Sequence, residues 1–185
     1  MRLKWAKIVF KRPAVIPHNF PGTHISVTRG GRSTCWGRGY PIIQRTHNLE
    51  LARDIDFVDS TASCDTTKCT VTVVLTATKA GAVPLAVLIH KEQSTDGYLA
   101  TFKLLKEAHS LCFGGQPAPQ VLMSDNSSAE KATLQQTWPS ASQLLCHFHV
   151  AQVEWRWLTT SRNCVDKDQR RRFMSAFQLA SFFEI

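Results

Sequence analysis

Two aspartates, Asp59 and Asp125, stand 66 residues apart at positions where strands are predicted to end. Carboxylate oxygens are the ligands that hard divalent cations such as Mg²⁺ and Mn²⁺ prefer. Two carboxylates within a few ångströms of each other repel strongly unless a cation lies between them. If the fold brings this pair together, it indicates metal-dependent phosphodiester chemistry, in which cations activate a water and stabilise the leaving oxygen.

Asp125 lies between an apolar run and a predicted helix. Residues 121–123 (VLM) read as a buried strand, while Ser127 and Glu130 fit the N-cap and N3 positions of a capping box. Pro139 ends that helix. Functional groups gather at the carboxyl ends of strands in open α/β sheets. The alternative is that Asp125 only caps the turn or the helix, which is a common role of aspartate.

Asp59 lies on the predicted strand 55–61, whose residues alternate between two faces. Ile55, Phe57 and Asp59 share one face, where a solvated charge is not expected except at the end of the strand. The rival acid is Asp56, which belongs to the opposite face. Three acids near this strand are interpreted as ordinary surface groups: Asp54, Asp56 and Asp65.

The other elements place these acids in a sheet. Three strands joined by short turns are predicted as an antiparallel meander: 55–61, 69–78 and 83–90. The meander is followed by a helix from Ser94 to Gly114, the strand before Asp125 and its helix. Then come a strand over 142–148 and two helical stretches, 149–160 and 166–183. This order fits an RNase H-like mixed α/β sheet, with three antiparallel strands and then two strands reached by helical crossovers; a generic α+β domain is the alternative. In an RNase H-like sheet the fourth strand lies beside the first.

Charge is distributed unevenly along the chain. Residues 1–53 hold ten Lys/Arg and one acid, a charge of +9, whereas residues 54–185 hold twelve Lys/Arg and thirteen acids, which leaves the chain at +8. The first segment also contains five of the nine glycines and is predicted to be largely irregular. We therefore divide the chain into a basic segment, 1–53, and a core, 54–185. The basic segment predicts either contact with nucleic-acid phosphates or a soluble tail.

Several protein classes are not indicated. No apolar run reaches the length of a membrane span, and the basic N-terminus lacks the apolar stretch of a secretory signal. The six scattered cysteines form no disulfide framework, so reduced thiols and an intracellular location are expected.

Cys146 and His149 form a Cys-x-x-His pair that could supply two zinc ligands. Because structural zinc needs four ligands, we prefer to interpret the pair as a buried cysteine and a hydrogen-bonded histidine.

Three blocks together carry a family resemblance: DFVDSTASCD, LMSDNSSAEKATLQQTWPSA and LLCHFHVAQ. In this order and spacing they resemble the Mutator-like element (MULE) transposase domain, which also occurs in domesticated form in SWIM-type zinc finger proteins. The resemblance covers roughly residues 54–185. It implies a DDE transposase core that cuts and joins DNA with Mg²⁺ or Mn²⁺, and thus a nuclear protein with DNA as its partner.

The resemblance also assigns residues. The first two acids of the family map onto Asp59 and Asp125, the block IHKEQSTDGY places Glu92 in a supporting position, and the Cys-x-x-His signature maps onto Cys146 and His149. The third acid of the family, a glutamate on a later helix, has no counterpart, since neither Glu154 nor Glu184 matches its block. We therefore expect a core that is incomplete at its C-terminus and inactive or very weak alone. The alternatives are a non-enzymatic DNA-binding or regulatory remnant, or a product without function.

Overall fold

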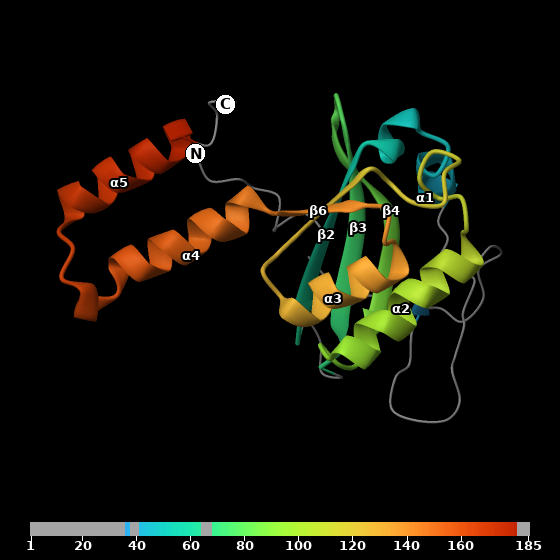
Figure 1. Cartoon of the computed structure of the whole chain (residues 1–185), viewed down its shortest axis with the longest axis horizontal. Helices are drawn as coiled ribbons and strands as arrows, with labels where there is room; N and C mark the ends of the chain where they lie inside the picture. The colour runs from blue at the N-terminus through green and yellow to red at the C-terminus, as the bar shows by residue number, and fades with distance from the viewer. Residues whose placement is uncertain (1–35, 38–40, 64–67, 181–185) are drawn as a thin grey trace.

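A computed structural model describes residues 36–37, 41–63 and 68–180. Its centre is one six-stranded sheet with the strand order β1-β4-β3-β2-β5-β6 (Figure 1). The strands are β1 (Trp36–Gly37), β2 (Ile55–Ala62), β3 (Thr70–Thr78), β4 (Gly81–His90), β5 (Val121–Ser124) and β6 (Ser142–Leu145). β2, β3 and β4 form the antiparallel meander, whereas β5 and β6 run parallel to β2. This mixed sheet confirms the predicted RNase H-like architecture.

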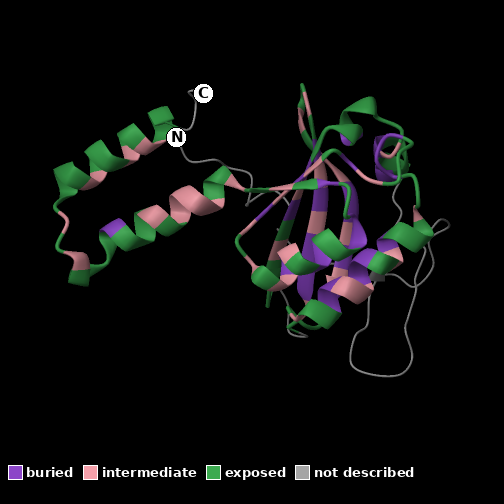
Figure 2. Cartoon of the chain, in the orientation of Figure 1, coloured by how far each residue is buried: buried purple, intermediate pink, exposed green. Residues whose placement is uncertain are grey.

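The helical elements surround this sheet. They are α1 (Pro41–Thr46), the 3-10 turn η2 (Glu50–Arg53), α2 (Thr95–Ala108), α3 (Ser128–Thr137), α4 (His147–Thr159), the 3-10 turn η3 (Ser161–Asn163) and α5 (Lys167–Ala180). The crossover helices α2 and α3 lie side by side on one face of the sheet (Figure 1). Between them and the strands lies the core, drawn in purple in Figure 2, which includes Val58, Val74, Leu122, Phe102 and Trp138.

The predicted helix caps are present. The Ser94 hydroxyl accepts a hydrogen bond from the Gly97 amide in α2, and the Ser127 hydroxyl accepts one from the Glu130 amide at 3.3 Å in α3. In a full capping box the Glu130 side chain would accept a hydrogen bond from the Ser127 amide. Here the carboxylate of Asp125 accepts that hydrogen bond, at 2.7 Å. This exchange frees the Glu130 side chain for another role.

Two predicted boundaries were wrong. α2 ends at Ala108 instead of reaching Gly114, because the chain turns there and buries Cys112 and Phe113 in the core. Gly114 belongs to this turn, with a φ of 59°. The last strand ends at Leu145, so the Cys-x-x-His pair opens a helix instead of closing a strand.

Part of the segment expected to be irregular is ordered. α1 packs on β4, and η2 packs on β2 and β3. Their buried side chains, Ile43 and Ala52, explain why residues 41–53 hold a fixed structure despite the basic, glycine-rich sequence before them. The expectation for residues 1–35 lies outside the described residues.

α4 and α5 form a helical hairpin that extends away from the sheet (Figure 1). Much of the hairpin is drawn in the exposed colour, green, in Figure 2. Several of its large apolar side chains are exposed: Phe148, Val153, Trp155, Trp157, Phe173 and Leu179. Within the described part of the chain, no helix has the length and hydrophobicity needed to cross a bilayer.

Candidate metal centre

Asp59 and Asp125 belong to neighbouring parts of the sheet. β2 and β5 are parallel neighbours, and Phe57 stands opposite Met123. Asp59 lies two residues beyond Phe57 within β2, and Asp125 lies two residues beyond Met123, just after β5 ends. If the register continued to these residues, the two acids would stand opposite each other on the same side of the sheet, where paired strands lie about 4.8 Å apart. Their meeting at one cation stays a prediction.

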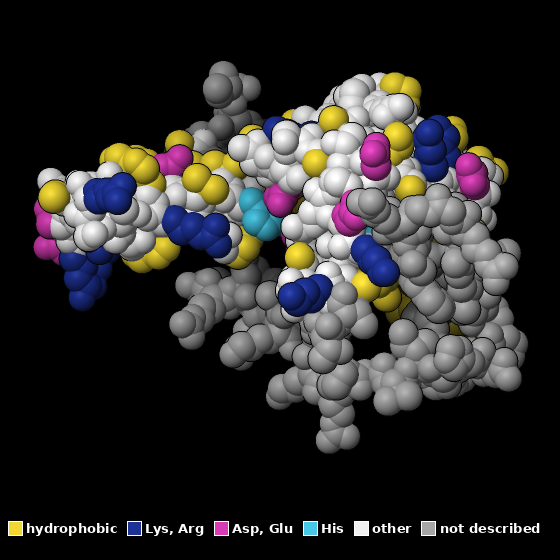
Figure 3. Space-filling model, turned by 90° about the horizontal axis from the view of Figure 1, so that it is seen from below, with side chains coloured by type: hydrophobic (Ala, Val, Ile, Leu, Met, Phe, Trp, Pro, Cys, Tyr) yellow, Lys and Arg dark blue, Asp and Glu magenta, His cyan; other side chains and the backbone are white. Residues whose placement is uncertain are grey.

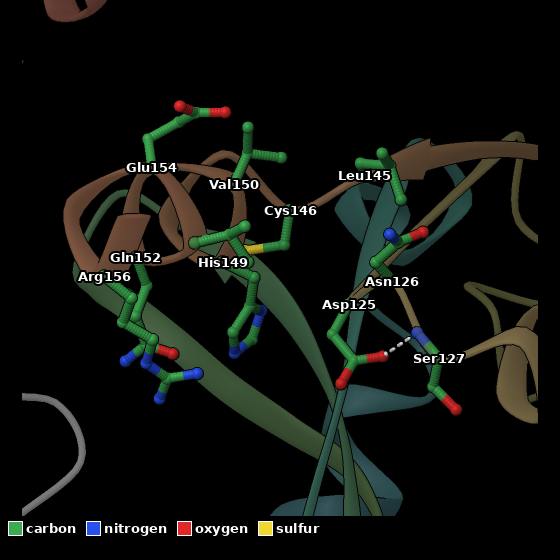
Figure 4. A pocket seen from close by; sticks show the side chains of 11 residues that line it. Asp125, Asn126, Ser127, Leu145, Cys146, His149, Val150, Gln152, Glu154 and Arg156 are labelled. Carbon is green, nitrogen blue, oxygen red and sulfur yellow. Dashed lines mark hydrogen bonds between the residues drawn. The ribbon is translucent and has the colours of Figure 1, made fainter. Parts of the chain in front are cut away.

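Asp125 lies in an open cavity between the sheet edge and α4. One carboxylate oxygen accepts the Ser127 amide, which fixes the orientation of the side chain (Figure 4). The cavity has a volume of about 390 Å³. Its lining combines Asp125, Asn126 and Ser127 with one side of α4, on which His149 points toward the aspartate (Figure 4).

Asp59 is a solvent-accessible acid. Its side chain is 60% exposed, and its Oδ1 lies 3.6 Å from Nε2 of His149. The histidine therefore connects the two acids: it pairs with Asp59 and lines the cavity of Asp125. A protonated imidazole at this distance neutralises Asp59, whereas a neutral one leaves the carboxylate open to a cation.

The expected burial of the two strand acids was reversed. Asp56 is fully buried, and neither of its carboxylate oxygens has a hydrogen-bond partner among the described residues. The reason is that α2 and α3 cover the face of Asp56 and Val58, while Ile55 on the other face stays 39% exposed. Burial raises the pKa of Asp56 to about 7, although the hydroxyl of Thr76 opposes part of this rise. Asp56 is thus a core carboxyl and no surface group.

Glu130 is a second buried acid, whose place near the site the sequence did not predict. It was interpreted as a capping residue, yet it is fully buried and its Oε2 accepts a hydrogen bond from Ser60 at 2.7 Å. Burial raises the pKa of Glu130 to about 7, and the charges of Asp125 and Asp59 add to this rise. Glu130 therefore lies within electrostatic range of both site acids, behind the strand ends.

A chain of hydrogen bonds continues from Glu130 across the sheet. The Ser60 hydroxyl contacts the hydroxyl of Thr72 at 2.8 Å, which contacts Nε2 of His90 at 2.9 Å. The other ring nitrogen of His90 bonds the backbone oxygen of Glu92 at 2.8 Å. Glu92 follows β4 at the same edge of the sheet, but its exposed side chain contacts Ser94 and does not line the cavity.

Cys146 and His149 lie together at the start of α4, and both line the cavity. His149 pairs with Asp59, and the buried Nδ1 of its ring finds no hydrogen-bond partner in the described part of the chain. Among the described residues, no group of three or more His, Cys, Asp or Glu side chains is placed to hold a metal ion. The two residues of the Cys-x-x-His pair are therefore close in space, and the described chain adds no third His, Cys, Asp or Glu to form a metal-binding group with them.

The acid pair fits a divalent cation in ligand chemistry and in charge. Both donors are carboxylates, as Mg²⁺ and Mn²⁺ prefer, and the imidazole of His149 lies against one of them. In Figure 3 acidic and histidine side chains meet where the hairpin joins the core, with Lys and Arg further out. Two carboxylates alone make an incomplete coordination shell, so water or substrate oxygens would complete it.

The sequence profile of the MULE transposase domain matches residues 57–153, which are 97 of the 185 residues. No curated protein sequence matches the chain significantly. The matched range begins on β2, two residues before Asp59, and ends on α4 beyond the Cys-x-x-His pair. It therefore includes the strand pair and the helix that build the cavity. The chain belongs to the MULE transposase domain family.

Proposed function

We propose that Asp59 and Asp125 hold a divalent cation against a DNA phosphate, as the metal-binding part of a transposase domain that cuts and joins DNA strands. The observation that supports this most is the parallel register of β2 and β5, which, continued by two residues, would set the two carboxylates side by side, with Asp59 accessible to solvent. A bound cation would supply Lewis-acid stabilisation of the phosphate oxygens and activate a water.

The residues of the chain would orient and balance these acids. The Ser127 amide holds one oxygen of Asp125 and leaves the other free to face the cavity. His149 holds Asp59 in the absence of a cation, and in its protonated form it would compete with the cation for the same oxygen. The positive ends of α3 and α4 both face the cavity and favour negative charge there.

The alternative is a domain that binds DNA without cutting it. The observation in its favour is that the described residues bring two acids to this edge, and no third acid joins them as a ligand. The described hairpin, residues 147–180, also carries six Lys/Arg and three acids, a surplus of three positive charges. Both alternatives predict DNA binding, and they differ in its dependence on metal.

Metal-dependent DNA affinity tests the proposal. Fluorescence anisotropy of a labelled duplex should show tighter binding when Mg²⁺ replaces EDTA, because a cation can bridge the carboxylates and a phosphate. Asp59→Asn and Asp125→Asn should abolish this gain. Glu107→Gln, which neutralises an exposed acid near the far end of α2, is the matched control and should keep it. An equal affinity with Mg²⁺ and EDTA would favour the non-enzymatic alternative.

A further inference from the structure

One face of α4 continues the cavity away from the acid pair. His149, Gln152 and Arg156 are spaced i, i+3 and i+7, which places them on one side of a helix. All three line the cavity, and Figure 4 shows their side chains extending from the same side of α4. Glu154 also lines the cavity, although its side chain extends away from this row in Figure 4, so the row itself carries no carboxylate.

Arg156 is the cationic end of this row. It is exposed, and among the described carboxylates none forms an ion pair with it. Two other arginines of the hairpin are engaged, since Arg171 lies 3.9 Å from Asp168 and Arg170 donates to the backbone oxygen of Val165 at 2.8 Å, while Arg162 and Arg172 are exposed and do not line the cavity. An unpaired guanidinium that lines the same cavity as Asp125 is well suited to bind a phosphate in bidentate fashion.

The spacing decides which phosphate Arg156 could reach. Seven residues of α-helix advance by about 10 Å, so Arg156 starts two turns beyond His149. A phosphate further along the same strand is therefore closer to Arg156 than one held by a cation at Asp59 and Asp125. Gln152 lies between them and can donate its amide to a sugar or phosphate oxygen.

We propose that the α4 face formed by His149, Gln152 and Arg156 is a track for the DNA strand that leaves the metal centre, and that Arg156 contacts a phosphate flanking the reacting one. Arg156 is thus a positioning residue for the substrate. This inference rests on the proposed function, because it takes DNA as the ligand and the acid pair as the site of the cation.

The test measures the affinity of the full chain for duplex DNA in EDTA over a series of salt concentrations. Arg156→Gln should weaken binding by about fivefold at low salt and lower the salt slope by about one, as expected for one lost phosphate contact. Arg156→Lys should keep the salt slope, because it retains the charge. Arg171→Gln, at the distal end of the hairpin, is the matched control and should change neither quantity.

The outcomes separate the inference from the proposed function. Equal affinities and slopes for Arg156→Gln and the unmodified chain, or an equal loss in Arg171→Gln, would overturn the track. Absence of DNA binding by the unmodified chain at low salt would overturn it as well. If the unmodified chain bound DNA no more tightly in Mg²⁺ than in EDTA, while Arg156→Gln still weakened binding in EDTA, the metal role of Asp59 and Asp125 would be overturned. The track would stand.

Discussion

At the scale of single residues, the carboxyl group of Asp56 sets a pH dependence of folding. It is fully buried without a hydrogen-bond partner among the described residues, and burial raises its pKa to about 7. Its charge also contributes, after burial, to raising the pKa of the neighbouring Cys112 thiol to about 12. A buried carboxyl of this kind is neutral at acidic pH, and its ionisation at higher pH destabilises the folded state.

The free energy of unfolding should therefore fall as the pH rises. Between pH 4 and 7 the folded state holds a proton on Asp56 that the unfolded chain has released. The stabilisation that this proton gives is therefore fully present below about pH 4 and is lost as the pH rises to about 7. The loss is at most about 4 kcal/mol for this one group. Asp56→Asn removes the titration and should flatten the curve in urea unfolding at a series of pH values.

The control for this prediction is Asp54→Asn, which neutralises an exposed acid two residues away. It should leave the pH dependence nearly unchanged. A steep pH dependence that persists in Asp56→Asn would mean that other groups, Glu130 first among them, account for it.

The residue types at the site could be predicted from the sequence, but their burial could not. Alternation along 55–61 correctly sorted Asp56 and Asp59 onto opposite faces. It could not tell which face α2 and α3 would cover, because both faces carry apolar residues, and so the exposed acid was expected to be Asp56. His149 was predicted from the family signature, but its ion pair with Asp59 depends on the path of the chain after β6.

At the scale of elements, Glu130 joins α3 to β2 directly behind the site. The helix N-cap was predicted correctly, and this position made the side chain of Glu130 appear to be part of the cap. Because Asp125 takes over the Ser127 amide, Glu130 instead turns inward to Ser60, the residue after Asp59. A local sequence pattern cannot reveal this, since the partner is 70 residues away in the chain.

Two substitutions of Glu130 should separate its hydrogen bond from its charge. Glu130→Gln keeps an acceptor for Ser60 and removes the ionisation, so above pH 7 it should be at least as stable as the native chain. Glu130→Ala leaves a cavity and deprives Ser60 of this acceptor, which should cost about 1–3 kcal/mol in unfolding free energy. Urea unfolding at pH 8 gives the comparison, and equal stabilities of the two variants would contradict this role.

At the scale of the whole molecule, the strands of the sheet could be predicted from the sequence more completely than the edge strand and the hairpin around it. The β-branched strands, the caps and the order of elements predicted five strands and both crossovers. The additional edge strand β1 has only two residues, Trp36–Gly37, and a pairing this short leaves no periodic pattern. The direction of the α4–α5 hairpin also lacks a local signal, because its exposed apolar residues would suit a helix packed on the sheet as well.

Metal-dependent cleavage is expected to be absent or very weak in this chain. Two acids give a cation fewer protein ligands than the three-acid site that the family resemblance implies, and the described residues offer no third one. Supercoiled plasmid incubated with Mn²⁺ should therefore stay largely intact, while the same protein binds DNA. Nicking by the purified protein that Asp59→Ala abolishes would overturn this expectation and make the chain an active nuclease.

The most direct test of the shared metal centre is a Mn²⁺ titration followed by electron paramagnetic resonance without DNA. The unmodified chain should bind one Mn²⁺ with a defined affinity, and Asp59→Asn and Asp125→Asn should each weaken that affinity by about tenfold or more, or about 1.4 kcal/mol. Glu107→Gln should have no effect. If either aspartate variant bound Mn²⁺ as tightly as the unmodified chain, Asp59 and Asp125 would not share a cation.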